Sequence, residues 1–327
     1  AQMAQRIMDD IVDLELEKVD AIIKKIENDP EPFELKRTEF ELWHKIRKKC
    51  IEGRRTGVGI TAEGDMMAAL GIRYGSEESV EFATEVQKTL ALEAYRSSVD
   101  MARLRGKFPI FDSEREKNNP FINRIKEADP ALYDDMVKYG RRNIALLTIA
   151  PTGTTSLMTQ TTSGVEPAFM VSYKRRRKVN PNDQKSRVDF VDGVGDSWEE
   201  YNVFHHKFIT WLNAKGYNPD EVATWDTDKL NEVIAASPYH NATANDVDWV
   251  MKVKLQGAIQ KWVDHSISVT VNIPNETPEE LVSQIYMTGW ESGCKGITVY
   301  RDGSRSGVLI ADDKREKKEK KEVAEKG

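Results

Sequence analysis

Residues 143–163 read NIALLTIAPTGTTSLMTQTTS, and the rest of the chain is organised around this stretch. Residues 144–150 form a continuous apolar run without Gly or Pro, which is typical of a strand buried on both faces. The run ends at Pro151, and a hydroxyl-rich turn then leads into helix-compatible residues. A strand, a turn and a helix start in this order present free backbone N–H groups and the helix dipole to an anion.

The turn consists of Thr152, Gly153, Thr154, Thr155 and Ser156. Its hydroxyls can cap the following helix, or they can bond phosphate oxygens directly. The residues alone leave both interpretations open. The turn is not a Walker loop, because the G-x-x-x-x-G-K-[ST] spacing and its Lys are both absent. The functional interpretation is therefore a phosphate cradle without a cation of its own.

Three further segments have strand patterns, near residues 57–61, 267–273 and 295–300. Helical patterns cover residues 5–26, 33–50, 65–70, 77–106, 129–139, 198–212, 228–236, 246–263 and 278–289, the last with Thr277 as its expected cap. Four short buried strands separated by helical connections predict parallel α/β units. Gly57 and Gly59 superficially fit a dinucleotide fingerprint, but the charged residues before them cannot form the buried strand that this fingerprint needs.

The bulk composition indicates a cytoplasmic protein in a reducing compartment. Of the 327 residues, 39% are hydrophobic and 31% charged, and the net charge of −6 argues against a nucleic-acid partner. The sequence has no apolar run near 18 residues, so we expect no membrane contact. Its two cysteines, Cys50 and Cys294, form no C-x-x-C motif and no zinc site on their own.

Two local patterns invite a binding interpretation and have plainer alternatives. Residues 174–178, KRRRK, could form a nucleic-acid patch, but no aromatic residue interleaves with them, so a solvated rim or a subunit contact is favoured. His205, His206 and His265 lack partners at metal-ligand spacing, which favours ordinary polar or capping roles.

The two ends of the chain differ in character. The first residues already have helical spacing without a cap, which suggests a truncated or split protein. From residue 312 the sequence reads DDKREKKEKKEVAEK, with almost nothing apolar. We therefore expect one unit over residues 1–310 and a charged linker or disordered tail over residues 311–327.

Four blocks of the sequence resemble ribonucleotide reductase large subunits. They are PTGTTS followed by TTSGVEPAF at residues 151–169, RTGVGITAEGDMMAALGIRY at 55–74, VDHSISVTVNIP at 263–274, and GCKGITVYRDGSR at 293–305. The blocks occur in the family's order and look closest to the adenosylcobalamin-dependent class (class II). Val299 stands where a class that receives its radical from a second subunit has a Tyr before Tyr300, which also favours the cobalamin class.

The resemblance implies a fold, a reaction and a set of partners. The fold would be the second half of a ten-stranded α/β barrel, and the reaction the radical reduction of ribonucleotides. Thr152, Gly153, Thr154, Thr155 and Ser156 match the substrate-phosphate positions, and Glu166 and Pro167 match the supporting turn. Adenosylcobalamin, the ribonucleotide and an N-terminal part of the reductase are the implied partners, with a homo-oligomer as a further expectation.

The implied radical chemistry needs a cysteine that this sequence does not place in the family's pattern. The family's radical cysteine lies in an N-x-C-x-E motif, and neither Cys50 nor Cys294 does. We expect the radical cysteine outside this chain and assign no catalytic residue or metal ligand within it. Two alternatives remain open: a non-catalytic nucleotide-phosphate-binding or assembly module, and a phosphoryl-transfer enzyme, the latter disfavoured because an Asp-rich metal motif is missing.

Overall fold

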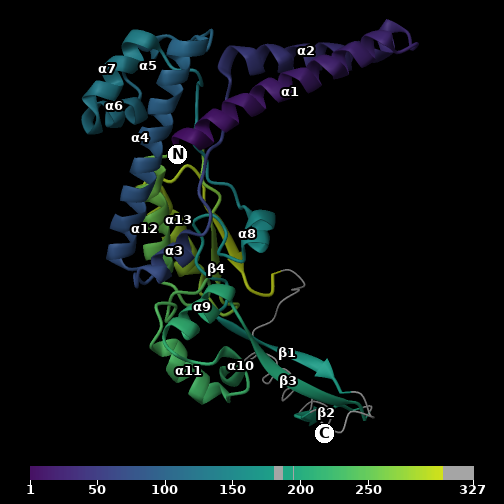
Figure 1. Ribbon diagram of the computed structural model, residues 1–327, viewed down its shortest axis with the longest axis vertical. Coiled ribbons are helices and arrows are strands. Elements are labelled where there is room, and N and C mark those ends of the chain that lie inside the picture. Colours follow the sequence, from purple (N-terminus) through teal and green to yellow (C-terminus); the bar gives the residue numbers. More distant parts are fainter. Residues whose placement is uncertain (180–186, 194, 305–327) are drawn as a thin grey trace.

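The computed structural model describes residues 1–179, 187–193 and 195–304 (Figure 1). The expected tail over residues 311–327 lies outside these residues. Most described elements are helices, and the strands fall into a parallel layer and a separate antiparallel sheet. Among the described helices, none is both long and apolar enough to cross a membrane.

The parallel layer contains the four strand segments that the sequence predicted. Val58 bridges Leu147 and Ile149 bridges Ile267, both in parallel orientation. Further along, β4 (Thr270–Ile273) pairs in parallel with β5 (Thr298–Arg301) from Thr270↔Thr298 to Ile273↔Arg301. The spatial order thus follows the chain order, with the segment near Val58 at one edge and β5 at the other. The described residues form no closed barrel.

Backbone hydrogen bonds join the first two segments to each other and to the third: Val58 N donates to Leu146 O, Thr148 N to Val58 O and Ile149 N to Ser266 O. The backbone N–H groups of Leu146 and Leu147 each donate to the Asp264 carboxylate at 2.8 Å and not to a neighbouring strand. The two segments approach closely at Gly59, where a Cβ atom would lie 2.2 Å from the Thr148 carbonyl oxygen. Only glycine is compatible with this approach.

Helices cover the parallel layer and build its core. They are α3 (Glu63–Ala69), α4 (Glu77–Arg105), α6 (Pro120–Ala128), α7 (Pro130–Tyr139), α12 (Trp249–Gln260) and α13 (Glu279–Glu291). Small buried residues of α4, such as Ala83, Ala91 and Ala94, pack in one apolar core with Leu147, Ile149 and residues of α12. α6 and the short α5 (Ser113–Glu116) were not predicted. The Thr277 prediction was wrong, because α13 begins after Pro278 without a side-chain cap.

The first two helices, α1 (Gln2–Asn28) and α2 (Phe33–Gly53), form an antiparallel pair that extends away from the layer (Figure 1). A buried polar network holds the base of this arm. Asp9 is fully buried and accepts from Arg54 Nε at 2.9 Å and Asn143 Nδ2 at 2.8 Å. Gln5, also fully buried, donates to the Asn143 amide oxygen at 3.0 Å. The arm is therefore fixed to the residue that precedes the central strand.

A second lobe combines an antiparallel sheet with three helices. Its strands are β1 (Ser172–Lys178), β2 (Phe190–Val191) and β3 (Ser197–Phe204), in the order β1-β3-β2. Its helices are α9 (His206–Ala214), α10 (Pro219–Val222) and α11 (Thr227–Ala235), packed around buried residues such as Phe208 and Leu212.

The helix expected over residues 198–212 was wrong in its first half. Trp198, Tyr201, Phe208 and Leu212 recur at intervals that a helix would place on one face. In the structure, residues up to Phe204 instead pair with β1, and the helix starts only at His206. These residues pair antiparallel with the basic strand β1, and two cross-strand ion pairs join them: Arg176 contacts Glu200 and Arg177 contacts Glu199, both at 2.6 Å.

Candidate phosphate site

The predicted turn lies where the central strand segment ends and α8 (Gly153–Thr159) begins. In open parallel layers, ligands bind at the carboxyl ends of the strands. The first backbone bond at this helix start runs from Ser156 N to Thr152 O at 2.8 Å, so the N–H groups of the three preceding residues have no intrahelical acceptor. Gly153, Thr154 and Thr155 are exposed. The turn therefore presents three backbone donors and two hydroxyls to solvent.

The hydroxyls of the turn do not all have the same role. Ser156 is buried, and its Oγ donates to Gly153 O at 2.8 Å and contacts Ser163 Oγ at 2.7 Å. Thr152 precedes the helix but forms no side-chain cap. Thr154 and Thr155 have no hydroxyl partner among the described residues. The capping interpretation is therefore wrong for Thr152, and Thr154 and Thr155 are the hydroxyls available to a ligand.

Thr152 has a left-handed backbone, with φ of 52°. Such a conformation is uncommon for a non-glycine residue and persists only where the surroundings determine it. The Thr152 hydroxyl accepts from Gly164 N at 2.7 Å and contacts Thr61 Oγ1 at 3.0 Å. These bonds tie the start of α8 to the end of the neighbouring strand segment and to the turn at Gly164.

Glu166 and Pro167, the predicted supporting turn, lie in contact with α3 and β4. Glu166 accepts from Thr270 N at 2.7 Å and forms an ion pair with Lys252, whose side chain is fully buried. Lys252 also donates to Thr270 O at 2.6 Å. Glu166 therefore joins α12 to β4. The Glu166–Pro167 backbone packs so closely on Gly64 that a Cβ atom there would lie 2.7 Å from Glu166 O.

A second carboxylate, Asp65, lies on the other side of the same turn. It accepts from Thr162 N at 2.8 Å through one oxygen, and from His205 Nε2 at 2.7 Å and Tyr239 Oη at 2.9 Å through the other. Asp65, Tyr239 and Lys252 were not predicted as site residues from the sequence. Lys252 could have been found, because it shares a helix face with the buried Leu255 and Ile259.

Glu63, the first residue of α3, is a buried carboxyl group without a hydrogen-bond partner for its Oε2 atom. Its backbone N–H donates to Gly164 O at 3.2 Å, so it adjoins the turn. Burial raises the pKa of Glu63 to about 8. The carboxyl group is therefore mostly protonated at neutral pH and adds little negative charge beside the candidate phosphate turn, residues 152–156.

Neither cysteine has the environment of an activated thiol. Glu52 does follow Cys50 at the C-x-E spacing, but position 48 is Lys, and Cys50 Sγ lies 3.8 Å from Glu15 Oε2. Burial and the Glu15 carboxylate raise the pKa of Cys50, and burial raises the pKa of Cys294. A raised pKa lowers the thiolate fraction, so both fit the expected role of ordinary thiols.

The histidines have separate settings. His205 belongs to the Asp65 cluster, whereas His265 Nδ1 lies 3.5 Å from Arg55 Nη1 and its Nε2 is buried without a partner. In the part of the chain that the structure describes, the cluster of His, Cys, Asp and Glu with ligand-like spacing is Asp9, Asp10 and Asp13. Asp9 already accepts hydrogen bonds from Arg54 and Asn143. These partners account for the buried Asp9 carboxylate without a metal ion.

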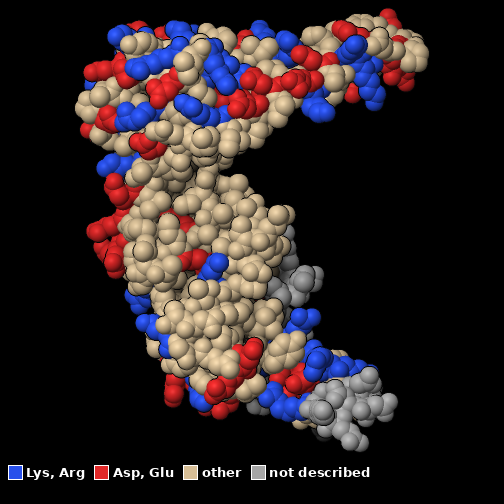
Figure 2. Space-filling view, viewed as in Figure 1, with Lys and Arg blue, Asp and Glu red and all other residues tan. Residues whose placement is uncertain are grey.

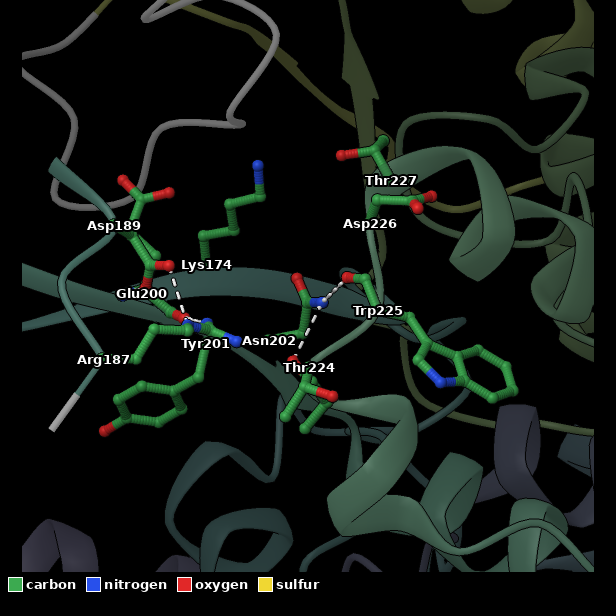
Figure 3. A pocket seen from close by; sticks show the side chains of 11 residues that line it. Lys174, Arg187, Asp189, Glu200, Tyr201, Asn202, Thr224, Trp225, Asp226 and Thr227 are labelled. Carbon is green, nitrogen blue, oxygen red and sulfur yellow. Dashed lines mark hydrogen bonds and ion pairs between the residues drawn. The ribbon is translucent and has the colours of Figure 1, made fainter. Parts of the chain in front are cut away.

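A pocket of about 280 Å³ lies in the second lobe, between β1, β3 and the connection from α10 to α11 (Figure 3). Charged side chains of both signs surround it, including Lys174, Arg187, Asp189 and Glu200. None of its lining residues belongs to the phosphate turn. The basic run at residues 174–178 is partly neutralised by acidic residues of β3 and by Asp196, which fits the solvated rim better than a nucleic-acid patch.

The strand ends and the exposed turn define a parallel α/β protein with a candidate anion site before a short helix. The family model described as ribonucleotide reductase, barrel domain, matches residues 35–300. The chain belongs to the ribonucleotide reductase family, and the matched part is the barrel domain.

Individual relatives agree with this assignment. The chain is 31% identical over 268 residues to a vitamin B12-dependent ribonucleoside-diphosphate reductase of Mycobacterium tuberculosis, covering 79% of this chain and 32% of the relative. A protein of the same name from Thermoplasma acidophilum is 30% identical over 291 residues, covering 86% of this chain and 33% of the relative. The chain thus spans about a third of the length of these curated relatives.

A solved structure supports the fold. The alpha subunit of the class Id ribonucleotide reductase of Actinobacillus ureae superposes with a TM-score of 0.51 at 18% identity, covering 81% of this chain and 44% of that chain. At this identity the likeness concerns the fold alone.

Proposed function

We propose that this chain supplies the C-terminal part of the catalytic barrel of an adenosylcobalamin-dependent ribonucleotide reductase, in which Thr152 to Ser156 bind the substrate phosphate. The family match over residues 35–300 carries this proposal. The exposed donors of Gly153, Thr154 and Thr155 support it, because backbone N–H groups and hydroxyls can replace water around phosphate oxygens. Few Lys or Arg side chains surround α8 in Figure 2, in keeping with a cradle without its own cation.

The parallel layer represents part of the barrel in this proposal. Its two outer members, the segment near Val58 and β5, have the remaining barrel strands as their expected neighbours. Leu157 and Met158 on α8 are about 80% exposed, which is unusual for two adjacent large apolar residues. An N-terminal part that carries N-x-C-x-E would cover such surfaces and bring the radical cysteine to the bound ribonucleotide.

We include adenosylcobalamin as the cofactor because the relatives are named vitamin B12-dependent reductases and because the sequence resembles the adenosylcobalamin-dependent class. Adenosylcobalamin would supply the radical that starts the reaction. His205, the histidine connected to the site, already gives its Nε2 to Asp65, so the residues beside the turn do not fit as a cobalt ligand set. We therefore place the cobalamin contacts in the rest of the protein. The residues of this chain bind and orient the diphosphate or triphosphate group.

The proposal is tested by measuring ribonucleotide binding to the 327-residue chain by calorimetry, with a cytidine nucleotide as the probe. Replacing Thr154 and Thr155 by Val preserves shape and deletes two hydroxyls, so affinity should fall by roughly 1–3 kcal/mol. Thr210→Val on α9 is the control, because its hydroxyl bonds only its own helix at His206 O. Equal affinity of the Thr154/Thr155 variant and the control would show that the turn does not hold the phosphate.

A further inference from the structure

A continuous chain of hydrogen bonds leads from the second lobe to the start of α8. His205 Nε2 and Tyr239 Oη donate to Asp65, and Asp65 accepts from Thr162 N. Thr162 O in turn accepts from Ala62 N at 3.1 Å and lies 3.3 Å from Thr61 Oγ1. Thr61 contacts Thr152, the residue that precedes the helix.

The central members of this chain are protected from water, whereas His205, Thr61 and Thr152 are half-buried. Asp65 is 5% exposed and Thr162 4%, and Tyr239, which packs on Phe208, is 4% exposed. Buried hydrogen bonds to a carboxylate are strong and leave little freedom to their partners. Asp65 N also donates to Thr162 Oγ1 at 3.2 Å, so Asp65 and Thr162 hold each other in both directions. The position of Thr162 is therefore determined by Asp65.

Thr152 links this chain of hydrogen bonds to the backbone donors that would bind a phosphate. Its left-handed backbone directs the N–H groups of the next three residues, and its hydroxyl is held by Thr61 and Gly164. Gly164 lies two residues after Thr162 and shares its turn. A shift of Thr162 would therefore move both groups that hold Thr152.

We propose that His205 and Tyr239 are positioning residues of the phosphate turn, which act through Asp65, Thr162 and Thr61 on the conformation of Thr152. The inference rests on the proposed function, because it assigns to the second lobe the task of setting the phosphate donors. The lobe holds the turn without touching the ligand.

The experiment removes the two donors to Asp65 in the full chain. Tyr239→Phe deletes one hydroxyl and keeps the ring that packs on Phe208, and His205→Leu deletes the other donor. His205→Gln is the rescue variant, because its amide can donate as Nε2 does. Asn202→Leu is the control in the same lobe: Asn202 bonds the carbonyls of Ala223 and Trp225 and does not touch Asp65.

Two measurements are made on each variant. Backbone amide resonances of Gly153 and Gly164 report the conformation of the turn, and calorimetry with inorganic pyrophosphate reports binding. We expect both amides to shift in Tyr239→Phe and His205→Leu, and pyrophosphate affinity to fall about tenfold, within the range for residues that act through others. His205→Gln should restore both properties, and Asn202→Leu should leave both unchanged.

The two proposals fail in different ways. If the unaltered chain binds no pyrophosphate, the proposed phosphate site is wrong, and the amide shifts still test the positioning role. If pyrophosphate binds but the amides of Gly153 and Gly164 do not move in Tyr239→Phe or His205→Leu, the positioning role is overturned. Shifts of equal size in Asn202→Leu would also overturn it, because any disturbance of the lobe would then suffice.

Discussion

Glu63 is a buried carboxyl group that contributes to the pH dependence of stability. Burial raises the pKa of Glu63 from 4.5 to about 8, so the folded state binds its proton more tightly than the unfolded state. Stability contributed by this proton is complete below the unfolded pKa and is lost as pH rises toward the folded pKa. The loss amounts to about 1.4 kcal/mol per pH unit over this window.

Replacing Glu63 by Gln should therefore flatten the pH dependence of stability. Urea unfolding of the unaltered chain should give a free energy of unfolding that falls by several kcal/mol between about pH 5 and pH 8. The Glu63→Gln variant should lose most of this slope. Parallel profiles for the two proteins would mean that Glu63 is ionised in the folded state.

Asp9 has the opposite behaviour. Burial raises its pKa, but the hydrogen bonds and charge of Arg54, together with Asn143 and Arg142, outweigh burial and lower the pKa below its usual value. A lowered carboxyl pKa contributes stability that is present above the unfolded pKa of 3.8 and lost as pH falls through the folded pKa. The buried pair thus stabilises the base of the arm at neutral pH.

Arg54→Met should leave the Asp9 carboxylate buried without its main partner. The expected cost is about 3–5 kcal/mol in the free energy of unfolding, because an uncompensated buried charge is expensive. Arg47→Met is the matched control: Arg47 pairs with the exposed Asp20 at 2.5 Å, and solvent screens exposed pairs so that they contribute little to stability. Denaturant unfolding of both variants decides the point, and equal losses would contradict the assignment.

At the scale of elements, the local sequence pattern predicted the strands correctly where the pattern of apolar residues matches the residues that are buried in the structure. The apolar run at residues 144–150 and the alternation at residues 267–273 identified members of the parallel layer, because such patterns are typical of buried strands. For residues 198–204 the same reasoning predicted a helix, which was wrong. These residues form a strand because they pair with β1, and their own spacing does not reveal this partner. Asp65 and His205 could not be paired from the sequence, since 140 residues separate them.

Lys252 supports a prediction about how α12 holds β4. In Lys252→Met, Glu166 keeps its bond to Thr270 N but loses the buried ammonium group. We expect a loss of about 1–3 kcal/mol, reduced from that of a fully buried pair because the Glu166 side chain is 23% exposed. Hydrogen exchange at Thr270 should accelerate, whereas Lys254→Met, two residues away and exposed, should leave it unchanged. Unaltered exchange at Thr270 would show that Glu166 alone holds β4.

In the whole molecule, the parallel layer could be predicted from the sequence, whereas the parts that extend from this layer could not. The parallel orientation of the strands and the position of the hydroxyl-rich turn before α8 followed from the sequence, whereas the packing of the arm of α1 and α2 and the antiparallel lobe did not. Both of the latter depend on contacts between distant residues, such as those of Asp9 with Arg54 and of Asp65 with Tyr239. Pairings of this kind leave no periodic pattern in the sequence.

The 327-residue chain alone should not reduce ribonucleotides, even with adenosylcobalamin and a dithiol supplied, because neither Cys50 nor Cys294 lies in N-x-C-x-E and burial raises the pKa of both thiols. Adding a separately made polypeptide that carries this motif should give turnover, measured as deoxyribonucleotide formed from a labelled ribonucleotide. The Thr154→Val/Thr155→Val chain serves as the control and should support less turnover with the same polypeptide. If the chain alone forms deoxyribonucleotides, the radical cysteine lies within it, and Cys294, just before β5, is the first residue to replace.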